Sequence, residues 1–335
     1  MTDQEKKIVL VTGGAGFIGS FLCEELLKEG NRVICVDNFS TGHVRNIDPY
    51  LRNPDFQFLR QDITEPFDLE SFPELEPFKV KFLGVQEIYH LAVAPSVTNF
   101  EKYRVQNTLV GSVGTRNILD MAVKYTSKVL LGSSSVVYGV PDLSGVFQEE
   151  YRGVVDHLGA HSAFDESRRF AETLVNTYAQ VYGIDTKIAR IFRAFGPRMP
   201  LFEGLQIPDF VVAALNGEDL SIQGTAETKT SLVYVVDIVS GLLAMMKMPA
   251  GTKPMNLGSD QNLLMRDVAQ QVLDMMRSAS KIAYTPPKVD GPIGLPDITR
   301  AKEVLGWTPV TRLEDGLQKT IDYIRANKIL LTGGE

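Results

Sequence analysis

The chain has 335 residues, of which 44% are hydrophobic and 22% charged, and its formal net charge is -7 at pH 7. This balance excludes a disordered chain, and the acidic charge argues against nucleic acid or an anionic membrane as the main partner, so we expect a small-molecule partner. No apolar run approaches the ~18 residues of a membrane span, and no signal-peptide core precedes the first predicted strand, so we expect a cytoplasmic protein.

Short β-branched runs alternate with amphipathic stretches through the first half of the chain. Helices are predicted over Phe17 to Glu29, over about Thr108 to Tyr125, and from Phe164 onward. The alternating pattern predicts a parallel sheet with right-handed crossovers, so the fold class is α/β, a doubly wound sheet of the Rossmann type. The predicted strands carry the runs KIVLVT, RVICVD, FQFLR, EIYHLA, KVLLGS and DTKIARIF.

The sequence changes after Phe195 to loops rich in glycine and proline. Helices are predicted near 208–216, 237–246, 265–277 and 312–326, which indicates a smaller C-terminal lobe for the substrate. We therefore divide the chain into a Rossmann domain at 1–192 and a substrate lobe at 193–335, interleaved with the first. The long connection at 64–84 is predicted to be a surface excursion with a short helix.

Gly13, Gly16 and Gly19 lie in the turn between the first predicted strand and helix. Such a turn brings the backbone close to a pyrophosphate, and the amides of the helix N-terminus bind that anion. Asp37 ends the second strand about 20 residues later, where an acid accepts hydrogen bonds from the adenosine ribose. Because its carboxylate would repel a 2′-phosphate, the pattern predicts NAD rather than NADP. The alternative is a glycine-rich turn without a ligand.

Six motifs, VTGGAGFIGS, VDNFSTG, YHLA, SSSVVYG, RIFRAFGPRM and LGWTP, occur in the order and spacing of the extended short-chain dehydrogenase/reductase family. The chain resembles this family from about Lys7 to Ile324, above all its UDP-glucuronate decarboxylases and nucleotide-sugar 4-epimerases. The resemblance implies a nucleotide-sugar substrate and a homodimer formed through the helices near Thr108 and Phe164. It also implies that NAD is contacted by Phe17, Ile18, Asn38, Asp62, Ile63, Leu91, Ala92 and Val93.

In that family a serine or threonine, a tyrosine and a lysine act together on a sugar hydroxyl while hydride passes to NAD. Ser134 matches the first of these, but Phe164 and Arg168 replace the tyrosine and the lysine. Phenylalanine cannot exchange a proton, so the usual base is absent, whereas Arg168 can still bind the nicotinamide ribose. Carboxylates that dehydratases and decarboxylases use after the serine are replaced by Ser135 and Val136.

Another residue could act as the base. His161 lies about one helical turn before Phe164 and has an unperturbed pKa of ~6.5, so we retain it as a candidate, with helix capping or a surface position as the alternative. Asp165 and Glu166 are expected to interact with the helix dipole. Tyr138 is expected to be structural.

The substrate lobe also departs from the family. The resemblance implies two phosphate-binding arginines, which align with Thr230 and Gly294, while Arg193 replaces a family asparagine. Losing two arginines removes charge-assisted bonds to a diphosphate. We expect Arg193, with Arg198 or Lys229, to hold a differently placed carboxylate or phosphate. Structural ion pairs are the alternative.

Three functions stay open. The first is an NAD-dependent enzyme of the epimerase or dehydrogenase type, which transfers hydride at a secondary alcohol of a nucleotide sugar with an atypical active site. The second is a catalytically silent NAD-binding homologue that acts as a sensor or partner subunit. The third is a divergent enzyme that uses bound NAD on a carboxylated or phosphorylated substrate. We favour an enzyme. No metal is expected, and the two cysteines are expected to be buried thiols.

Overall fold

The central sheet has seven parallel strands in the order β12-β7-β5-β4-β1-β2-β3. The structure is a computed structural model that describes residues 6–93, 100–142, 144–286 and 294–327. The strand order reverses between β1 and β4, and ligands bind at such a reversal in doubly wound folds. The predicted fold class is confirmed. The strands are β1 (Ile8–Thr12), β2 (Arg32–Asp37), β3 (Phe56–Arg60), β4 (Glu87–His90), β5 (Lys128–Ser134), β7 (Thr186–Ile191) and β12 (Met255–Leu257).

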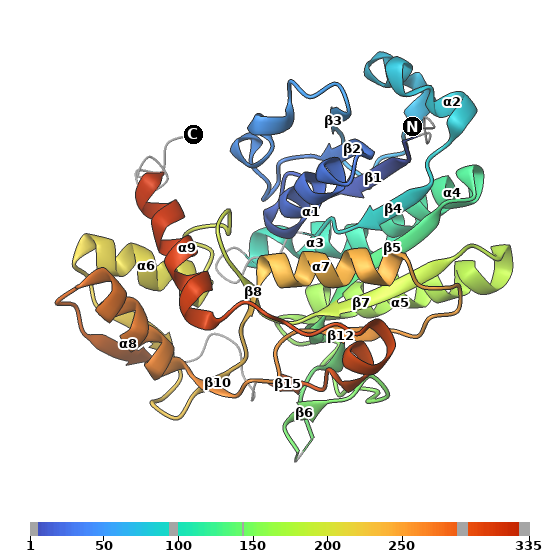
Figure 1. Cartoon of the computed structure of the whole chain (residues 1–335). Coiled ribbons are helices and arrows are strands. Elements are labelled where there is room, and N and C mark those ends of the chain that lie inside the picture. The colour runs from blue at the N-terminus through green and yellow to red at the C-terminus, as the bar shows by residue number, and fades with distance from the viewer. Residues whose placement is uncertain (1–5, 94–99, 143, 287–293, 328–335) are drawn as a thin grey trace.

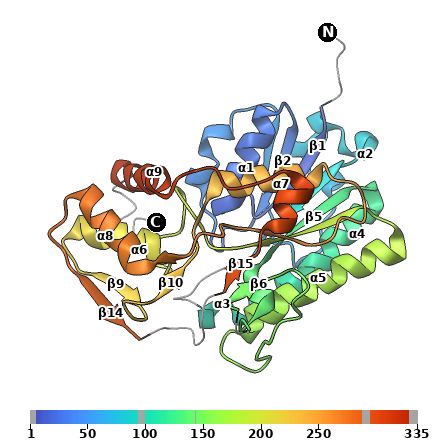
Figure 2. The same ribbon diagram turned by 60° about the horizontal axis from the view of Figure 1, so that its bottom comes forward.

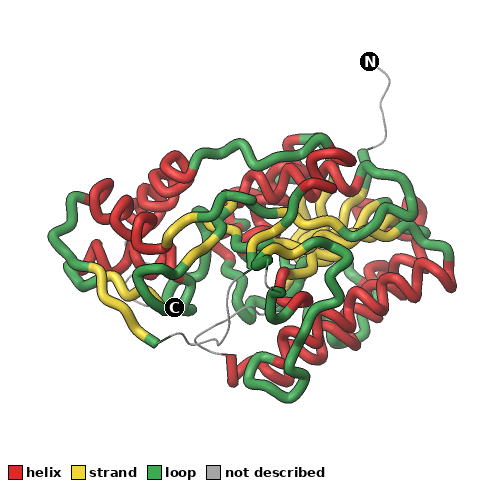
Figure 3. Tube along the Cα trace, turned by 90° about the horizontal axis from the view of Figure 1, so that it is seen from below, coloured by secondary structure: helices red, strands yellow, loops and turns green. Residues whose placement is uncertain are grey.

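Helices cover both faces of this sheet (Figures 1 and 3). On one face lie α1 (Phe17–Lys28) and α7 (Val235–Met246), whose apolar side chains share a core with β1 and β2. On the other face lie α4 (Thr115–Tyr125) and α5 (Ser162–Tyr182). Because both faces are buried, the strands are apolar along nearly their whole length.

The helix predicted from about Thr108 begins earlier than expected. α3 (Phe100–Leu109) runs through a π-helical turn (Val110–Gly114) directly into α4. The sequence of α3 is polar, so it carries too few apolar residues for a helical period to reveal it. A π-helical turn is rare and is frequently found at functional sites.

The C-terminal lobe lies to one side of the sheet (Figure 2). Its core is formed by α6 (Gln206–Asn216), α8 (Met265–Met276), α9 (Leu313–Ala326) and β9 (Leu220–Gln223), which pairs with β14 (Ile282–Thr285). Three short strand pairs lie outside the central sheet and outside the β9–β14 pair. They are β6 (Val146–Phe147) with β15 (Leu295–Pro296), β8 (Ala194–Phe195) with β11 (Val233–Tyr234), and β10 (Lys229–Thr230) with β13 (Leu263–Leu264).

The chain returns to the sheet after residue 193. α7 packs against α1, and β12 pairs with β7 through Met255 and Ala189. The excursion predicted at 64–84 contains α2 (Val80–Leu83) and two 3-10 turns. Cys23 and Cys35 are buried free thiols, as expected.

In the part of the chain that the structure describes, no helix is both long and apolar enough to cross a membrane. The same residues contain no cluster of His, Cys, Asp and Glu that could hold a metal ion.

Candidate cofactor and substrate site

The glycine turn after β1 leaves no room for side chains. Gly13 has a φ of 69°, in the left-handed region that favours glycine, and its amide donates to the Val36 carbonyl at 2.8 Å. A Cβ at Gly13 would lie 2.9 Å from the Ala92 backbone, and one at Gly19 would lie 2.1 Å from the Gly13 carbonyl oxygen. The turn is therefore as tight as a pyrophosphate-binding turn requires.

The N-terminus of α1 is open to an anion. The helix begins directly after Gly16, no side chain caps it, and its first turn holds no acidic residue. The amides of Phe17, Ile18 and Gly19 precede Ser20, whose amide is the first to donate within the helix, to the Gly16 carbonyl, so they are available to a phosphate. The side chains of Phe17 and Ile18 are partly buried against the core of the C-terminal lobe.

Asp37 is fixed beside this turn at the end of β2. Its two carboxylate oxygens accept hydrogen bonds from the amides of Ala15, at 3.0 Å, and Phe39, at 2.8 Å. Burial raises the pKa of Asp37, against the lowering effect of these two bonds. A carboxylate has about four lone-pair positions, so two are left for ribose hydroxyls. The residue fits the role predicted for it.

Asn38 and Asp62 are hydrogen bonded to each other, with 2.9 Å between the Asn38 amide nitrogen and the Asp62 carboxylate. Partial burial works to raise the pKa of Asp62, but hydrogen bonds from Thr64, Asn38 and Gln106 outweigh it and lower that pKa. Ile63 is only 4% exposed and belongs to the core below the sheet. The contact of Asp62 and Ile63 with adenine stays a prediction.

The loop after β4 is held against the glycine turn. The amides of Leu91 and Ala92 both donate to the Thr12 hydroxyl, each at 3.2 Å, and Val93 follows them at the last described position before the gap. His90 lies fully buried below this loop, and burial lowers its pKa to about 3, so its ring is neutral. The predicted cofactor residues of β1, β2 and β4 thus meet at one edge of the sheet.

Ser134 ends β5 and begins a 3-10 helix (Ser135–Tyr138). Its hydroxyl accepts a long hydrogen bond, 3.4 Å, from the Val136 amide. In the register of the sheet it lies opposite Ile191 of β7. Among the described residues no histidine is hydrogen bonded to Ser134, so its hydroxyl can bind a substrate but has no base beside it.

Arg168 is the least compensated side chain of the site. It is 1% exposed, and none of its three guanidinium nitrogens has a hydrogen-bond partner among the described residues. Burial lowers its pKa to about 10, opposed by the charge of Glu172 one turn further along α5. A buried cation without partners is costly, so acceptor groups of a ligand are expected at this guanidinium. Ribose hydroxyls of NAD are acceptors of the right kind.

His161 and Phe164 begin the same helix. His161 occupies the N-cap position, but its side chain makes no capping hydrogen bond. Its carbonyl accepts hydrogen bonds from the amides of Phe164, at 3.0 Å, and Asp165, at 3.1 Å. Phe164 is half-buried. The side-chain capping alternative for His161 is therefore wrong, and its role as a base stays a prediction.

Asp165 is a residue whose environment the sequence did not reveal. Burial, and secondarily the charge of Glu166, raises its pKa to about 7. Its position in the first turn was expected to stabilise the ionised carboxylate through the helix dipole, but burial has the larger effect. Its side chain points ~100° around the helix from Phe164, so it contacts different neighbours.

This pKa predicts a pH-dependent stability. The Asp165 carboxyl keeps its proton up to about pH 7 when folded but loses it near pH 4 when unfolded, so the folded state loses stability as pH rises through that interval. Asp165→Asn is expected to stabilise the protein by about 1 to 2 kcal/mol at pH 8, discounted for partial exposure, and by little near pH 4. Denaturant unfolding at both pH values measures this. Glu303→Gln, which removes an exposed carboxylate far from Asp165 in the sequence, is the control, and equal effects of the two substitutions would contradict the assignment.

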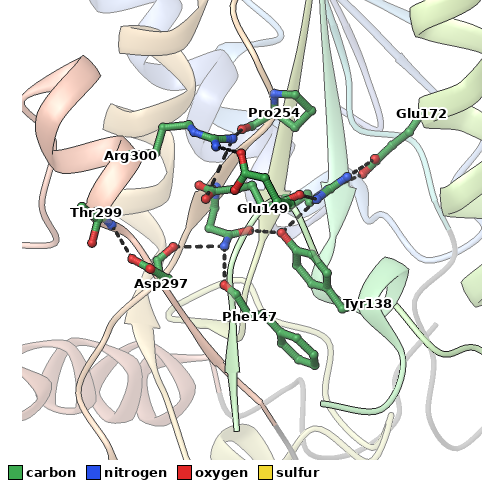
Figure 4. A network of polar contacts seen from close by, with 11 residues as sticks. Tyr138, Phe147, Glu149, Glu172, Pro254, Asp297, Thr299 and Arg300 are labelled. Atoms are coloured by element: carbon green, nitrogen blue, oxygen red, sulfur yellow. Dashed lines mark hydrogen bonds and ion pairs between the residues drawn. The ribbon is translucent and has the colours of Figure 1, made fainter. Parts of the chain in front are cut away.

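Tyr138 belongs to a network of polar contacts that includes Phe147, Glu149 and Glu172 (Figure 4). Its hydroxyl donates to the Asn256 side-chain oxygen at 2.6 Å and accepts from the Arg190 guanidinium at 2.9 Å. Burial raises its pKa to about 12, against the lowering effect of Arg190. Tyr138 therefore cannot replace the missing tyrosine as a base, in agreement with the structural role expected of it.

The three predicted substrate cations differ in their surroundings. Arg198 donates to Glu24 at 2.8 Å and lies 4.3 Å above the ring of Phe21. For Arg198 the alternative, a structural ion pair, is therefore correct.

Lys229 is exposed on β10. Arg193 directly follows Phe192 at the end of β7, and its side chain makes no ion pair or hydrogen bond with the described residues.

The two positions expected to carry arginines in relatives are closed. A Cβ at Gly294 would lie 2.2 Å from the ring of Phe147, so this position has no space for any side chain. Thr230 is fully buried, and its hydroxyl oxygen has no hydrogen-bond partner in the described part of the chain.

Comparison with known proteins agrees with this geometry. The sequence model of the NAD dependent epimerase/dehydratase family matches residues 9–258. The chain is 36% identical over 326 residues to UDP-glucuronic acid decarboxylase 1 of Xenopus tropicalis, covering 97% of this chain and 74% of that protein.

Solved structures of similar fold include nucleotide-sugar epimerases. A UDP-glucose 4-epimerase of Thermotoga maritima, solved with UDP-glucose, superposes with a TM-score of 0.83 at 27% identity, covering 96% of this chain and 99% of that one. A UDP-glucuronic acid 4-epimerase of Bacillus cereus, solved with UDP-glucuronic acid and NAD, superposes with a TM-score of 0.81 at 26% identity, covering 95% and 99%.

Proposed function

The chain belongs to the NAD-dependent epimerase/dehydratase family, and on this basis we propose that it transfers hydride between NAD and a secondary alcohol of a nucleotide sugar, with an active site that lacks the Tyr-x-x-x-Lys pair. The observation that carries the proposal is the buried, unpaired guanidinium of Arg168. A cation that replaced lysine only by chance would have no reason to keep its three guanidinium nitrogens buried without partners among the described residues.

NAD, when bound, accepts the hydride. The glycine turn and the N-terminus of α1 hold its pyrophosphate, and Asp37 accepts hydrogen bonds from the adenosine ribose. Arg168 orients the nicotinamide ribose through its guanidinium donors. Ser134 hydrogen bonds the substrate hydroxyl that is oxidised. Because Phe164 has no proton to exchange, the hydroxyl proton passes to His161, to water, or to a group on the substrate itself.

A second candidate function is supported by Arg193. An unpaired cation at the end of β7 favours a divergent enzyme whose substrate carries a carboxylate or phosphate. The catalytically silent homologue is the third candidate, and it is supported by the phenylalanine at position 164 and by the two closed arginine positions.

We also propose the division at residue 192 and a homodimer formed through α4 and α5. Apolar side chains exposed near this surface support the dimer, among them Val105, which is 73% exposed, and Phe170, which is 48% exposed. Tyr178 of α5 donates to Asp120 of α4 within the chain at 2.6 Å, so its hydroxyl is already paired.

The purified protein is expected to contain NAD and to show a transient at the reduced-nicotinamide absorbance band when it meets its sugar nucleotide. UDP-, GDP-, CDP- and dTDP-sugars are added in turn, and exchange of a labelled hydrogen or a new product is sought. Protein stripped of NAD is the control. Bound NAD without transient, exchange or product for any sugar would favour the silent homologue.

A further inference from the structure

We propose that Arg193 binds a carboxylate on the sugar ring that is oxidised, and that it thereby determines which sugar the site accepts. The inference rests on the proposed function and adds the residue that selects the substrate. It follows from the charge of Arg193, from its place at the end of β7 and from the closed position at Gly294.

The charge of Arg193 is uncompensated. Its side chain is exposed and makes no ion pair with a carboxylate of the described residues, and desolvation by the neighbouring protein lowers its pKa to about 10. The arginines on either side in the sequence are different, because Arg190 is paired with Glu172 at 2.7 Å and Arg198 with Glu24 at 2.8 Å. Arg193 is thus a cation that no described residue pairs with, so its guanidinium is available to an anionic group of a ligand.

The backbone around Arg193 is fixed. Its carbonyl accepts a hydrogen bond from the Val233 amide at 3.1 Å, at the start of the pairing between β8 and β11. The cation therefore stands on a strand connection and not on a loose loop. A preformed position of this kind lowers the cost of ordering the side chain when a ligand binds.

The phosphates of the cofactor cannot supply this anion. The glycine turn follows β1, and β7 is three strands away in the sheet order β7-β5-β4-β1. At ~4.8 Å between neighbouring strands, the two ends are ~14 Å apart. The oxidised nicotinamide ring at the other end of NAD is itself positively charged. The anion at Arg193 is therefore a group of the substrate.

The register indicates which part of the substrate it is. Ser134 lies opposite Ile191 on the neighbouring strand, and Arg193 is two residues beyond Ile191. The neighbouring strands are ~4.8 Å apart and two residues add ~6.6 Å along the chain, so the two positions are ~8 Å apart, a separation that one sugar ring with its substituents spans. A group bound by Arg193 is thus carried on the same ring as the hydroxyl at Ser134. The ring of Phe147 closes the position of Gly294, so no cation can be placed there.

Calorimetric titration of the NAD-loaded protein with UDP-glucuronate and UDP-glucose tests this, because the two ligands differ only in the carboxylate. Arg193→Gln is expected to weaken binding of UDP-glucuronate about 10- to 100-fold and that of UDP-glucose less than about threefold. Arg193→Lys keeps the charge and is expected to retain most of the preference. Because the substitution removes an uncompensated cation, the variant is expected to fold.

Arg266→Gln is the matched control, since it removes an equally charged side chain from the surface of α8. Equal weakening of both ligands by Arg193→Gln would assign the residue to the diphosphate and overturn the inference, while leaving the proposed function in place. If the unmodified protein bound neither sugar nucleotide, the proposed function would fail together with the inference. Retained NAD content and circular dichroism show that each variant is folded.

Discussion

Phe164→Tyr combined with Arg168→Lys is expected to raise turnover on nucleotide sugars by ~10²- to 10⁴-fold, the usual contribution of a positioned acid–base group. Phe164 is half-buried, so the hydroxyl of a tyrosine at this position can point toward the exposed side of the ring. Lysine at 168 replaces a guanidinium whose three nitrogens have no partner in the described chain. Steady-state rates with the sugar nucleotide that binds best measure the gain.

The two single variants are the controls. A tyrosine beside Arg168 faces a bulkier guanidinium in place of the lysine ammonium, and a lysine without the tyrosine has nothing to activate, so each alone is expected to gain far less than the pair. A folded, NAD-containing double variant without any gain would mean that the substrate site has diverged beyond the chemistry of the family.

Gly19→Ala is expected to weaken NAD binding by about 100-fold or more. The new methyl group would lie 2.1 Å from the Gly13 carbonyl oxygen, so the turn would have to open. Opening it removes at least two hydrogen bonds to a charged pyrophosphate, each worth ~1.5 to 3 kcal/mol. Titration with NAD measures the affinity, and the rise in melting temperature on adding NAD measures it independently.

Gly30→Ala is the matched control. Gly30 follows the end of α1, and a Cβ there would meet nothing within 4 Å, although its φ of 84° disfavours a side chain. This variant is expected to lose about 1 kcal/mol of folding stability and to bind NAD normally. Normal NAD affinity in Gly19→Ala would show that the glycine turn is not the pyrophosphate site.

Parts of this protein that depend on contiguous residues were predictable from the sequence. The glycine turn, the acid at Asp37 and the alternation of strands and helices each depend on the local residue types, and the structure has all of them. Even there the polar sequence of α3 concealed its helix, because a helix without an apolar stripe gives no periodic signal.

Parts that depend on distant residues were decided only by the tertiary structure. From the sequence, Arg198 could either bind a ligand or form a structural ion pair, and the fold places Glu24 of α1 beside it. Gly294 aligns with an arginine expected in relatives, and the ring of Phe147 in β6 fills the space that a side chain would need there. The pKa of Asp165 and the isolation of Arg168 and Arg193 likewise follow from how much protein surrounds each group and which charges face it. The sequence by itself determined the fold and the cofactor, because both depend on local residue types. Which charges are left for a ligand was decided by the packing, because burial and pairing depend on elements that are far apart in the chain.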